Sequence, residues 1–338
     1  MALIDFKVLP GIDKQDTASG AEFRWVDCDN TRFRYGLPEK VGGWSSLVTD
    51  TIVGVARREF AFVDLDGNRY VAIGTDKFLL IYFEGQLYDI TPLKTTLTSA
   101  TLATTNTSAI CSITTGTNHN LSVGDIVLLD TVTLPVGTGY VDADFENKLF
   151  QVTSITSATV FTITQSTAAT ATVGTGGSLS VKPYEQVGPA EQSYGYGWGI
   201  DTWSSGKWGE AASASDVSLE PGLWSLSNFG QVLVATIANG KTFTWNAGDA
   251  ARLTTRASTA TSGFETTNNP TATRITLVSP TTRHLIHLGT ETTIGDPTTQ
   301  DDMFIRFSDQ EDINDYVPTA INSAGSQRLQ DGTRIMGA

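Results

Sequence analysis

The feature that most constrains the fold of this chain is the period of its apolar residues. Apolar residues alternate with polar ones or form short β-branched runs, and no segment keeps the spacing of an amphipathic helix beyond two turns. A helix needs apolar positions every three or four residues, whereas a strand turns every second side chain toward one face. The pattern therefore predicts an all-β fold built from short strands.

The alternation between residues 59 and 90 comes in four runs, at 59–64, 69–74, 77–83 and 86–90. Turn residues at 66–68 separate the first run from the second, and those at 84–85 separate the third from the fourth, because Gly accepts a positive φ and Asp or Asn tolerates one. Four short antiparallel strands joined by tight turns predict one blade of a β-propeller. A plain meander within a sandwich is the alternative.

The composition changes after Pro92. From 93 to 183 Thr is abundant, whereas aromatic and charged residues are sparse. Because Thr is β-branched and half-polar, it suits the solvent-facing positions of strands, and strands are expected at 108–114, 125–130, 148–153 and 159–164. We interpret 93–183 as an inserted small β-sandwich or barrel domain. It separates an N-terminal segment with the first blade (1–92) from an aromatic loop with further blades (184–338).

The segment 194–209 alternates Gly with aromatic residues and cannot bury a continuous core by itself. We expect Trp198, Trp203 and Trp208 to pack against the propeller body or a neighbouring subunit, because rings left in water forgo the free energy of burial. A platform that stacks sugars is the alternative. Replacing Trp203 by Ala is expected to lower assembly or thermal stability, whereas unchanged assembly with lost sugar binding would favour the platform.

The remaining third of the chain repeats the hairpin pattern. Strands are expected at 231–236 and 241–245, joined across the Asn239-Gly240 turn, and again at 274–279, 283–288 and 303–308. Strand pairs punctuated by Gly turns and aromatic residues favour successive blades of one propeller-like body, which this chain need not complete.

Metal-ligating residues are few and badly spaced. His119 lies in a loop ahead of a strand, and His284 and His287 are three apart, which places them on opposite faces of a strand. Cys28 and Cys111 lack the spacing of zinc ligands and cannot form a disulfide framework. We expect no metal and no cofactor.

Catalytic patterns are equally weak. The segment 64–68 has the start of a calcium loop without its distal Glu, and 174–177 lacks the Lys and the helix of a phosphate loop. The acidic run 308–312 with Asp315 offers paired carboxylates of the kind that hydrolyse glycosides, but crowding in one loop favours a turn-forming role. We expect a protein that is not an enzyme.

The charge balance excludes several partners. With 22 Lys and Arg against 36 Asp and Glu, the net charge is −14. A chain this acidic is unsuited to wrapping nucleic acid by counterion release or to docking on an anionic membrane. No apolar run has the length of a membrane span or of a signal peptide, so no membrane insertion is expected.

Several segments together resemble the large β-propeller structural proteins of short-tailed bacteriophage tails, called tail tubular protein B, nozzle or hub. The resemblance covers roughly 30–92 and 185–338. Within the insert, 118–125 and 150–153 resemble small β modules that are common in phage structural proteins. The segments that carry the main resemblance are 37–44 (LPEKVGGW), 70–75 (YVAIGT), 87–92 (LYDITP), 223–230 (LWSLSNFG), 305–312 (IRFSDQED) and 316–320 (YVPTA).

The resemblance implies a virion protein of the tail that forms a ring of identical subunits, with six as the expected number. The ring would lie below the portal, contact the head-tail adaptor and the tail fibres or spikes, and let DNA pass through its lumen without specific binding. Members of this family are usually about twice as long, so either the chain is truncated or another polypeptide supplies the remaining blades. An acidic lining would repel phosphates over about 8 Å at physiological salt.

Two other functions compete with this one. The first is a surface adhesin or receptor-binding tail spike with a Thr-rich β module. The second is a β-propeller enzyme that processes glycans, using acids between Asp309 and Asp315 and aromatic residues between Trp198 and Trp208. A ring, a trimeric spike and a monomer differ in symmetry, so images of the particles separate the three.

Overall fold

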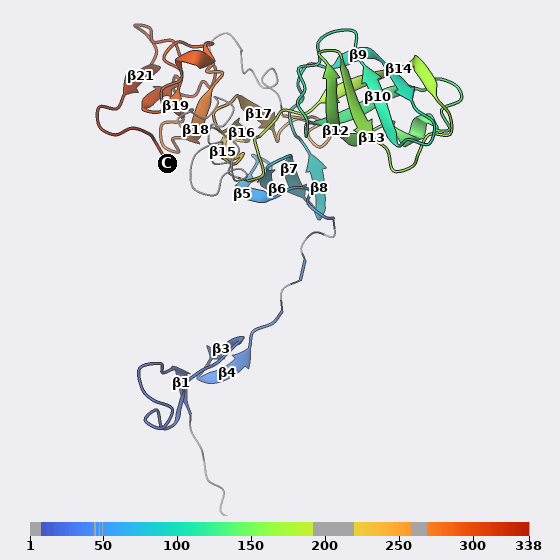
Figure 1. Cartoon of the computed structure of the whole chain (residues 1–338). Helices are drawn as coiled ribbons and strands as arrows, with labels where there is room; N and C mark the ends of the chain where they lie inside the picture. Colours follow the sequence, from blue (N-terminus) through green and yellow to red (C-terminus); the bar gives the residue numbers. More distant parts are fainter. Residues whose placement is uncertain are drawn as a thin grey trace, which may run out of the picture. The chain divides into compact units, whose positions relative to one another are not determined.

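The computed structural model describes residues 8–337 apart from 44, 47, 49, 192–219 and 258–268. These residues form twenty-one strands and two short 3-10 helices, η1 (Asp142–Asp144) and η3 (Pro297–Thr299) (Figure 1). The all-β fold class is therefore confirmed. The chain divides into two compact units, Met1–Thr49 and Asp50–Ala338.

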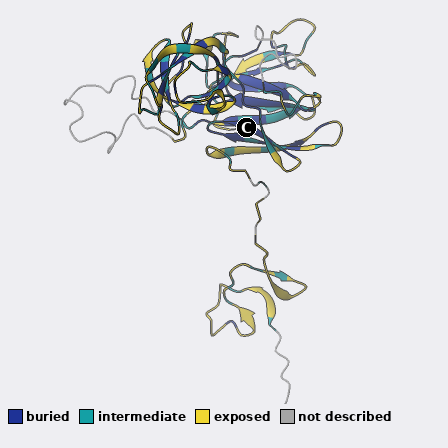
Figure 2. Cartoon of the chain, turned by 90° about the vertical axis from the view of Figure 1, so that its right-hand side faces the viewer, coloured by how far each residue is buried: buried dark blue, intermediate teal, exposed yellow. Residues whose placement is uncertain are grey.

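The N-terminal unit contains two strand pairs and almost no core. Its exposed apolar side chains include Leu9, Tyr35 and Leu37, and Ala21 is the one buried apolar residue among those described in this unit (Figure 2). Its strands are thus held by backbone pairing more than by packing. The parallel pair is β1 (Leu9–Ile12) with β2 (Arg24–Trp25), and the antiparallel hairpin is β3 (Thr31–Arg34) with β4 (Leu37–Lys40).

The four strands expected between 59 and 90 form one antiparallel sheet, here called sheet A, in the order in which they occur along the chain. They are β5 (Ala56–Val63), β6 (Arg69–Thr75), β7 (Leu79–Phe83) and β8 (Gln86–Asp89). Glu84 and Gly85 have φ values of 47° and 88°, and positive φ at both positions matches the twist of a two-residue hairpin. The carboxylate of Asp64 accepts hydrogen bonds from the backbone N of Asp66 and Asn68 at 2.9 and 2.8 Å. The expected hairpin turn is therefore confirmed.

The Thr-rich segment forms a closed six-stranded barrel. Its strands are β9 (Leu97–Thr104), β10 (Ile110–Thr114), β11 (Ile126–Thr133), β12 (Lys148–Ser157), β13 (Val160–Thr164) and β14 (Val173–Pro183), in the spatial order β10-β13-β12-β11-β14-β9. Alternate side chains such as Leu102, Ile113 and Phe161 fill its interior, while many Thr and Ser residues lie on the outer positions. That 93–183 folds as an independent domain stays a prediction.

The predicted later hairpins belong to two further antiparallel sheets. Sheet B contains β15 (Trp224–Phe229), β16 (Val232–Ile237) and β17 (Thr242–Asn246). Sheet C contains β18 (Thr273–Val278), β19 (Leu285–Thr290), β20 (Phe304–Phe307) and β21 (Gly325–Arg328).

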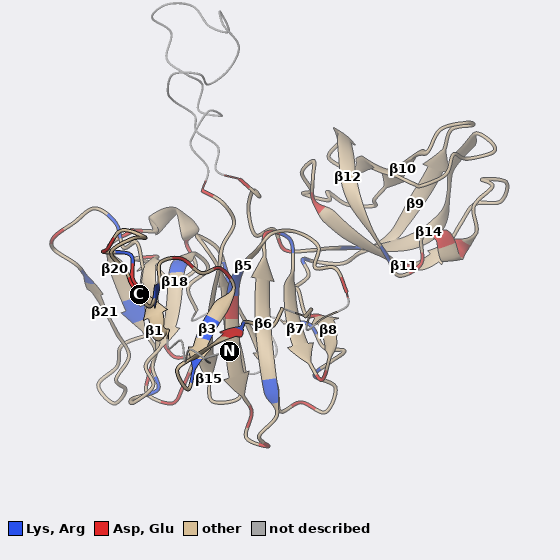
Figure 3. Cartoon of the chain, turned by 90° about the horizontal axis from the view of Figure 1, so that it is seen from below, with Lys and Arg blue, Asp and Glu red and all other residues tan. Residues whose placement is uncertain are grey.

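Sheet B lies between sheets A and C, and successive side chains of β16 face these two sheets in alternation. Leu233, Ala235 and Ile237 enter the core that sheet B shares with sheet A, whereas Val234 enters the core shared with sheet C. Thr236 also bonds across to sheet C, through its hydroxyl and that of Thr276. The first strands of the sheets, β5, β15 and β18, lie side by side (Figure 3). Consecutive propeller blades have this arrangement, and a complete propeller stays a prediction.

Gly74 on β6 permits the contact between sheets A and B. A Cβ at this position would lie 2.6 Å from Cδ1 of Trp224, whose indole Nε1 donates to the carbonyl of Thr75 at 3.0 Å. Gly74→Ala is expected to lower the free energy of unfolding by about 1–3 kcal/mol, because the added methyl overpacks a rigid ring. Gly116→Ala is the control, because nothing lies within 4 Å of its Cβ position. Equal stability of the two variants in urea denaturation would contradict the close contact.

Candidate functional site

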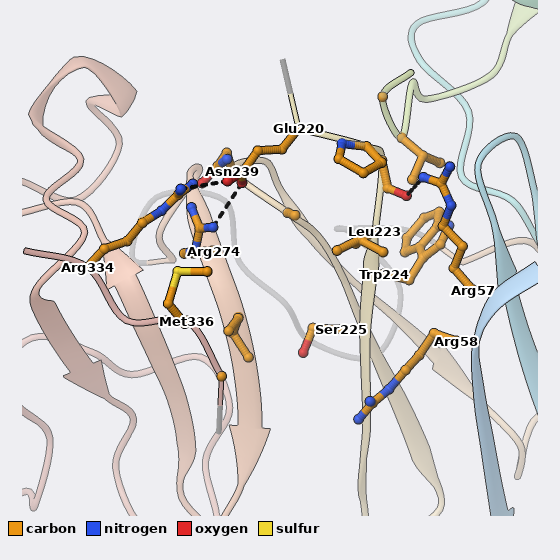
Figure 4. Close-up of a pocket in the computed structure, with 17 residues that line it drawn as sticks. Arg57, Arg58, Glu220, Leu223, Trp224, Ser225, Asn239, Arg274, Arg334 and Met336 are labelled. Atoms are coloured by element: carbon orange, nitrogen blue, oxygen red, sulfur yellow. Dashed lines mark hydrogen bonds and ion pairs between the residues drawn. The ribbon is translucent and has the colours of Figure 1, made fainter. Parts of the chain in front are cut away.

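The first strands of sheets A, B and C, which are β5, β15 and β18, line a cavity of about 520 Å³. Figure 4 shows Arg274 and Arg334 on one side, Arg57 and Arg58 on the other, and residues of β15 between them. The remaining lining comes from the chain segments that precede β15, from the turn before β17 and from the C-terminal segment. The lining residues are Arg57, Arg58, Val187, Gly188, Glu220, Pro221, Gly222, Leu223, Trp224, Ser225, Ala238, Asn239, Arg274, Ile275, Arg334, Met336 and Gly337.

Two of the arginines share one carboxylate at this cavity. Nη2 of Arg274 donates to Oε2 of Glu220 at 2.8 Å, and Nη1 of Arg334 lies 2.5 Å from the other carboxylate oxygen. Burial by itself would raise the pKa of Glu220, but the hydrogen bonds from Arg334 and Arg274 lower it below its usual value. Glu220 is thus held ionised and bridges sheet C to the C-terminal segment.

Of the other two arginines, Arg57 is held by backbone carbonyls, whereas Arg58 is not. Nη1 of Arg57 donates to the carbonyl of Gly222 at 2.7 Å, and its Nη2 donates to the carbonyl of Ala190. The two segments it joins also bond each other, since Gly222 N donates to Pro189 O at 2.9 Å. The side chain of Arg58 is exposed and forms no hydrogen bond or ion pair with the described part of the chain.

A second cluster of polar residues lies where the barrel joins the sheets. The hydroxyl of Tyr184 donates to Oδ2 of Asp89 at 2.6 Å, and Nη2 of Arg256 donates to the same hydroxyl at 2.6 Å. The Arg256 guanidinium lies 4.7 Å above the Tyr184 ring and 3.0 Å from the Asp89 carboxylate. Burial and then the nearby Asp89 charge raise the pKa of Tyr184 well above its usual value. We call these three residues the neck cluster.

The two chain segments that lead into and out of the barrel run side by side at the neck. Lys94 N donates to Pro183 O at 2.8 Å, and Leu93 pairs with Tyr184 as an isolated antiparallel bridge. Deleting 95–182 and joining the ends with a short linker is therefore expected to leave the remainder soluble. Aggregation of the deletion variant in sizing chromatography would show that the barrel is part of the main core. The neighbouring cluster that deletion uncovers contains Phe78, Leu80 and Tyr184, with Ile126 and Leu128 contributed by the barrel.

Each of the three histidines forms hydrogen bonds within the fold. Nε2 of His119 lies 3.0 Å from the carbonyl of Ser157, and its Nδ1 accepts from Leu121 N at 3.0 Å. His284 precedes β19 and lies 2.8 Å from the carbonyl of Ser308. His287 is completely buried on β19. No group of three or more His, Cys, Asp or Glu residues that could hold a metal ion occurs within the described ranges.

A chain of hydrogen bonds holds His287. Thr290 donates its hydroxyl to Ala272 O at 3.0 Å, so the hydroxyl of Thr273, 3.0 Å away, must donate to Thr290. Thr273 therefore accepts from His287 Nδ1 at 2.9 Å, and His287 Nε2 accepts from the Tyr316 hydroxyl at 2.9 Å. The pattern assigns a neutral imidazole with its proton on Nδ1.

The acidic loop uses its carboxylates to form turns. Asp309 accepts hydrogen bonds from the backbone N and the hydroxyl of Ser323 at 2.7 and 2.6 Å, and Asp315 accepts from the amide of Asn322 at 2.7 Å. Glu311 pairs with Arg283 at 3.2 Å. Hydrogen bonds from Ser323 lower the pKa of Asp309 below its usual value.

Other candidates have plain structural positions or none. The glycines at 174–177 belong to β14, and Cys111 is buried in the barrel core, whereas Cys28 is half-buried. Trp198, Trp203 and Trp208 lie outside the described residues, so their packing stays a prediction. The sequence reasoning missed the arginine-rich cavity, because its four arginines are distributed over 57–334 and meet only through the stacking of the three sheets.

In the part of the chain that the structure describes, no helix has both the length and the apolar character required to cross a bilayer.

Comparisons with known proteins give few matches. No family and no curated protein matches the sequence. Among solved structures, the chain is similar to one titled Phage phi92 endosialidase, with 14% sequence identity and a TM-score of 0.23. The match covers 79% of this chain and 36% of that one, and at this TM-score it carries no argument.

Proposed function

We propose that this protein is a structural subunit of a bacteriophage tail, located in the nozzle or hub ring. In this role it joins the head-tail adaptor to the distal parts of the tail and lines a stretch of the DNA ejection channel. The observation that carries the proposal is the stacking of three meander sheets in chain order, with β5, β15 and β18 side by side. Consecutive blades of a β-propeller stack in this way, and a β-propeller is the architecture of the nozzle proteins that the sequence resembles.

Two of the segments that resemble phage nozzle proteins, 70–75 and 223–230, contact each other in the fold. Trp224, in 223–230, packs on Gly74 and bonds the carbonyl of Thr75, both in 70–75. Ser225 donates to the carbonyl of Thr276 at 2.7 Å, which ties the same segment to sheet C. The resemblance therefore falls on residues that join the sheets, which supports a shared architecture.

Assembly, and not catalysis, is the proposed activity. The carboxylates of Asp309, Asp312 and Asp315 accept hydrogen bonds from their own loop, an arrangement suited to shaping a surface. Acidic residues occur on loops of both the barrel and the sheets (Figure 3). With a net charge of −14, a lumen lined by this protein would repel DNA phosphates and favour rapid passage.

Particle symmetry tests the proposal most directly. Sizing chromatography with light scattering and negative-stain images of the purified chain are expected to show rings of six copies. Gold labelling of the chain in intact virions is expected to mark the tail below the connector. A stable trimer would favour a receptor-binding spike, and label over the capsid shell would overturn the assignment.

DNA binding tests the channel role separately. The free protein is expected to show no salt-dependent affinity for duplex DNA in fluorescence anisotropy, because release of counterions requires a basic surface. Tight binding with a steep salt slope would contradict a lumen that lets DNA pass.

A further inference from the structure

We propose that the arginine-rich cavity binds an organic anion, with Arg58 and Arg274 supplying the charged hydrogen bonds. The charged residues of the lining are four arginines and Glu220, which leaves three positive charges in excess. The whole chain carries a net charge of −14, so this concentration of positive charge is a local exception. The proposal does not depend on ring assembly.

Arg274 supplies the strongest indication of a missing partner. The residue is 8% exposed, and its Nη2 is used by Glu220 at 2.8 Å. Its Nη1 is also buried but has no hydrogen-bond partner among the described residues. A buried N–H of a charged group without a partner costs free energy, and an oxygen of a bound anion would remove that cost.

Arg58 supplies a second, accessible donor. Its side chain is exposed, lines the same cavity and is engaged by no described residue. Figure 4 places it across the cavity from Arg274 and Arg334. A ligand in the cavity therefore meets guanidinium groups from both sheet A and sheet C.

The size and lining indicate an anion with an organic body. A volume of about 520 Å³ lies within the range of small-molecule sites and exceeds the space that a single ion fills. Leu223 and Met336 also line the cavity, and they are 44% and 73% exposed. Apolar surface is therefore available beside the charges. Guanidinium groups bind carboxylates and phosphates through paired N–H donors, and either group fits this lining.

The test uses the full chain with two probes at constant ionic strength, sodium citrate for carboxylates and inorganic phosphate for phosphates, against sodium chloride. At about ten times its dissociation constant, a bound probe is expected to raise the melting temperature by about 2–4 °C. The titration is expected to saturate in at least one of the two arms, and that arm identifies the anionic group.

Three variants separate binding at the cavity from a general salt effect. Arg58→Gln and Arg274→Lys are each expected to weaken binding about 10-fold or more, because each removes a charge-assisted donor. Arg274→Lys keeps a cation beside Glu220, so folding is preserved. Arg69→Gln, at an exposed arginine outside the lining, is expected to bind like the wild type. The absence of a saturating shift in both arms, or equal shifts in all four proteins, would overturn the proposal.

Discussion

Lowering the pH from 7 to 5 is expected to reduce the free energy of unfolding by about 2 kcal/mol through His287 alone. Burial, and then the positive charge of Arg306 on the adjacent strand, lower the pKa of His287 to about 3. The unfolded chain has the ordinary value near 6.5, so it binds a proton that the folded chain rejects. Stability is therefore complete above pH 6.5 and falls as the pH decreases toward 3.

The hydrogen-bond chain explains why protonation is costly. Nε2 of His287 accepts the proton of the Tyr316 hydroxyl, and Nδ1 already carries a proton that it donates to Thr273. A second proton on the ring would meet the Tyr316 donor without an acceptor nearby. Arg306, which pairs with His287 across β19 and β20, adds repulsion.

Urea denaturation monitored by circular dichroism at pH 7, 6 and 5 measures the effect. His287→Gln is expected to be less stable at pH 7 and to lack the part of the slope that comes from this residue. The range above pH 5 is chosen because the carboxylates with lowered pKa values, such as Asp309 and Glu220, lose their stabilising charge at lower pH. An unchanged slope in His287→Gln would show that the imidazole does not remain neutral.

The sequence predicted the hairpins because their signals are local. Glu84-Gly85 and Asn239-Gly240 are turns in which Glu84, Gly85 and Asn239 have positive φ, and strong alternation flanks both. The sheet between 56 and 89 followed directly from these signals. Local chemistry is enough when a strand's partner is its neighbour along the chain.

Two barrel strands escaped prediction for the opposite reason. β9 and β14 are rich in Thr, Ser and Gly, and they pair with each other although they lie at opposite ends of the insert. The alternation of buried and exposed positions in these two strands can be recognised only in the closed barrel, which buries Ala100, Leu102, Leu179 and Val181. The same limit applies to the arginine-rich cavity, which depends on how three sheets stack.

Buried polar residues mark a further limit. Thr236, Thr242 and Thr276 join their hydroxyls between sheets B and C at 2.8–2.9 Å, although Thr in a strand usually predicts a solvent-facing position. No local pattern distinguishes these residues from the Thr on the outside of the barrel. Their burial follows from sheet B being covered on both faces.

Replacing Trp245 by Ala is expected to cost about 3–5 kcal/mol of stability. The ring is 2% exposed and forms edge contacts with Tyr70 at 5.6 Å and Phe62 at 6.4 Å between ring centres. Its Nε1 also donates to the carbonyls of Arg252 and Thr255 at 3.0 and 3.1 Å. Removal leaves both a cavity and two carbonyls without this donor. Trp25→Ala, at a 37% exposed ring in the N-terminal unit, is the control and is expected to change stability by less than about 0.5 kcal/mol.

The location of Trp245 also predicts which part of the protein loses stability. Trp245 belongs to the core shared by sheets A and B, and the barrel interior forms a separate cluster of buried residues. In calorimetry, Trp245→Ala is therefore expected to lower the transition of the sheets and to leave that of the barrel in place. Because the neck cluster ties the two parts through Tyr184, a competing outcome is one transition that shifts as a whole. That result would mean that the barrel and the sheets unfold as one cooperative body, and it would contradict an independently folding insert.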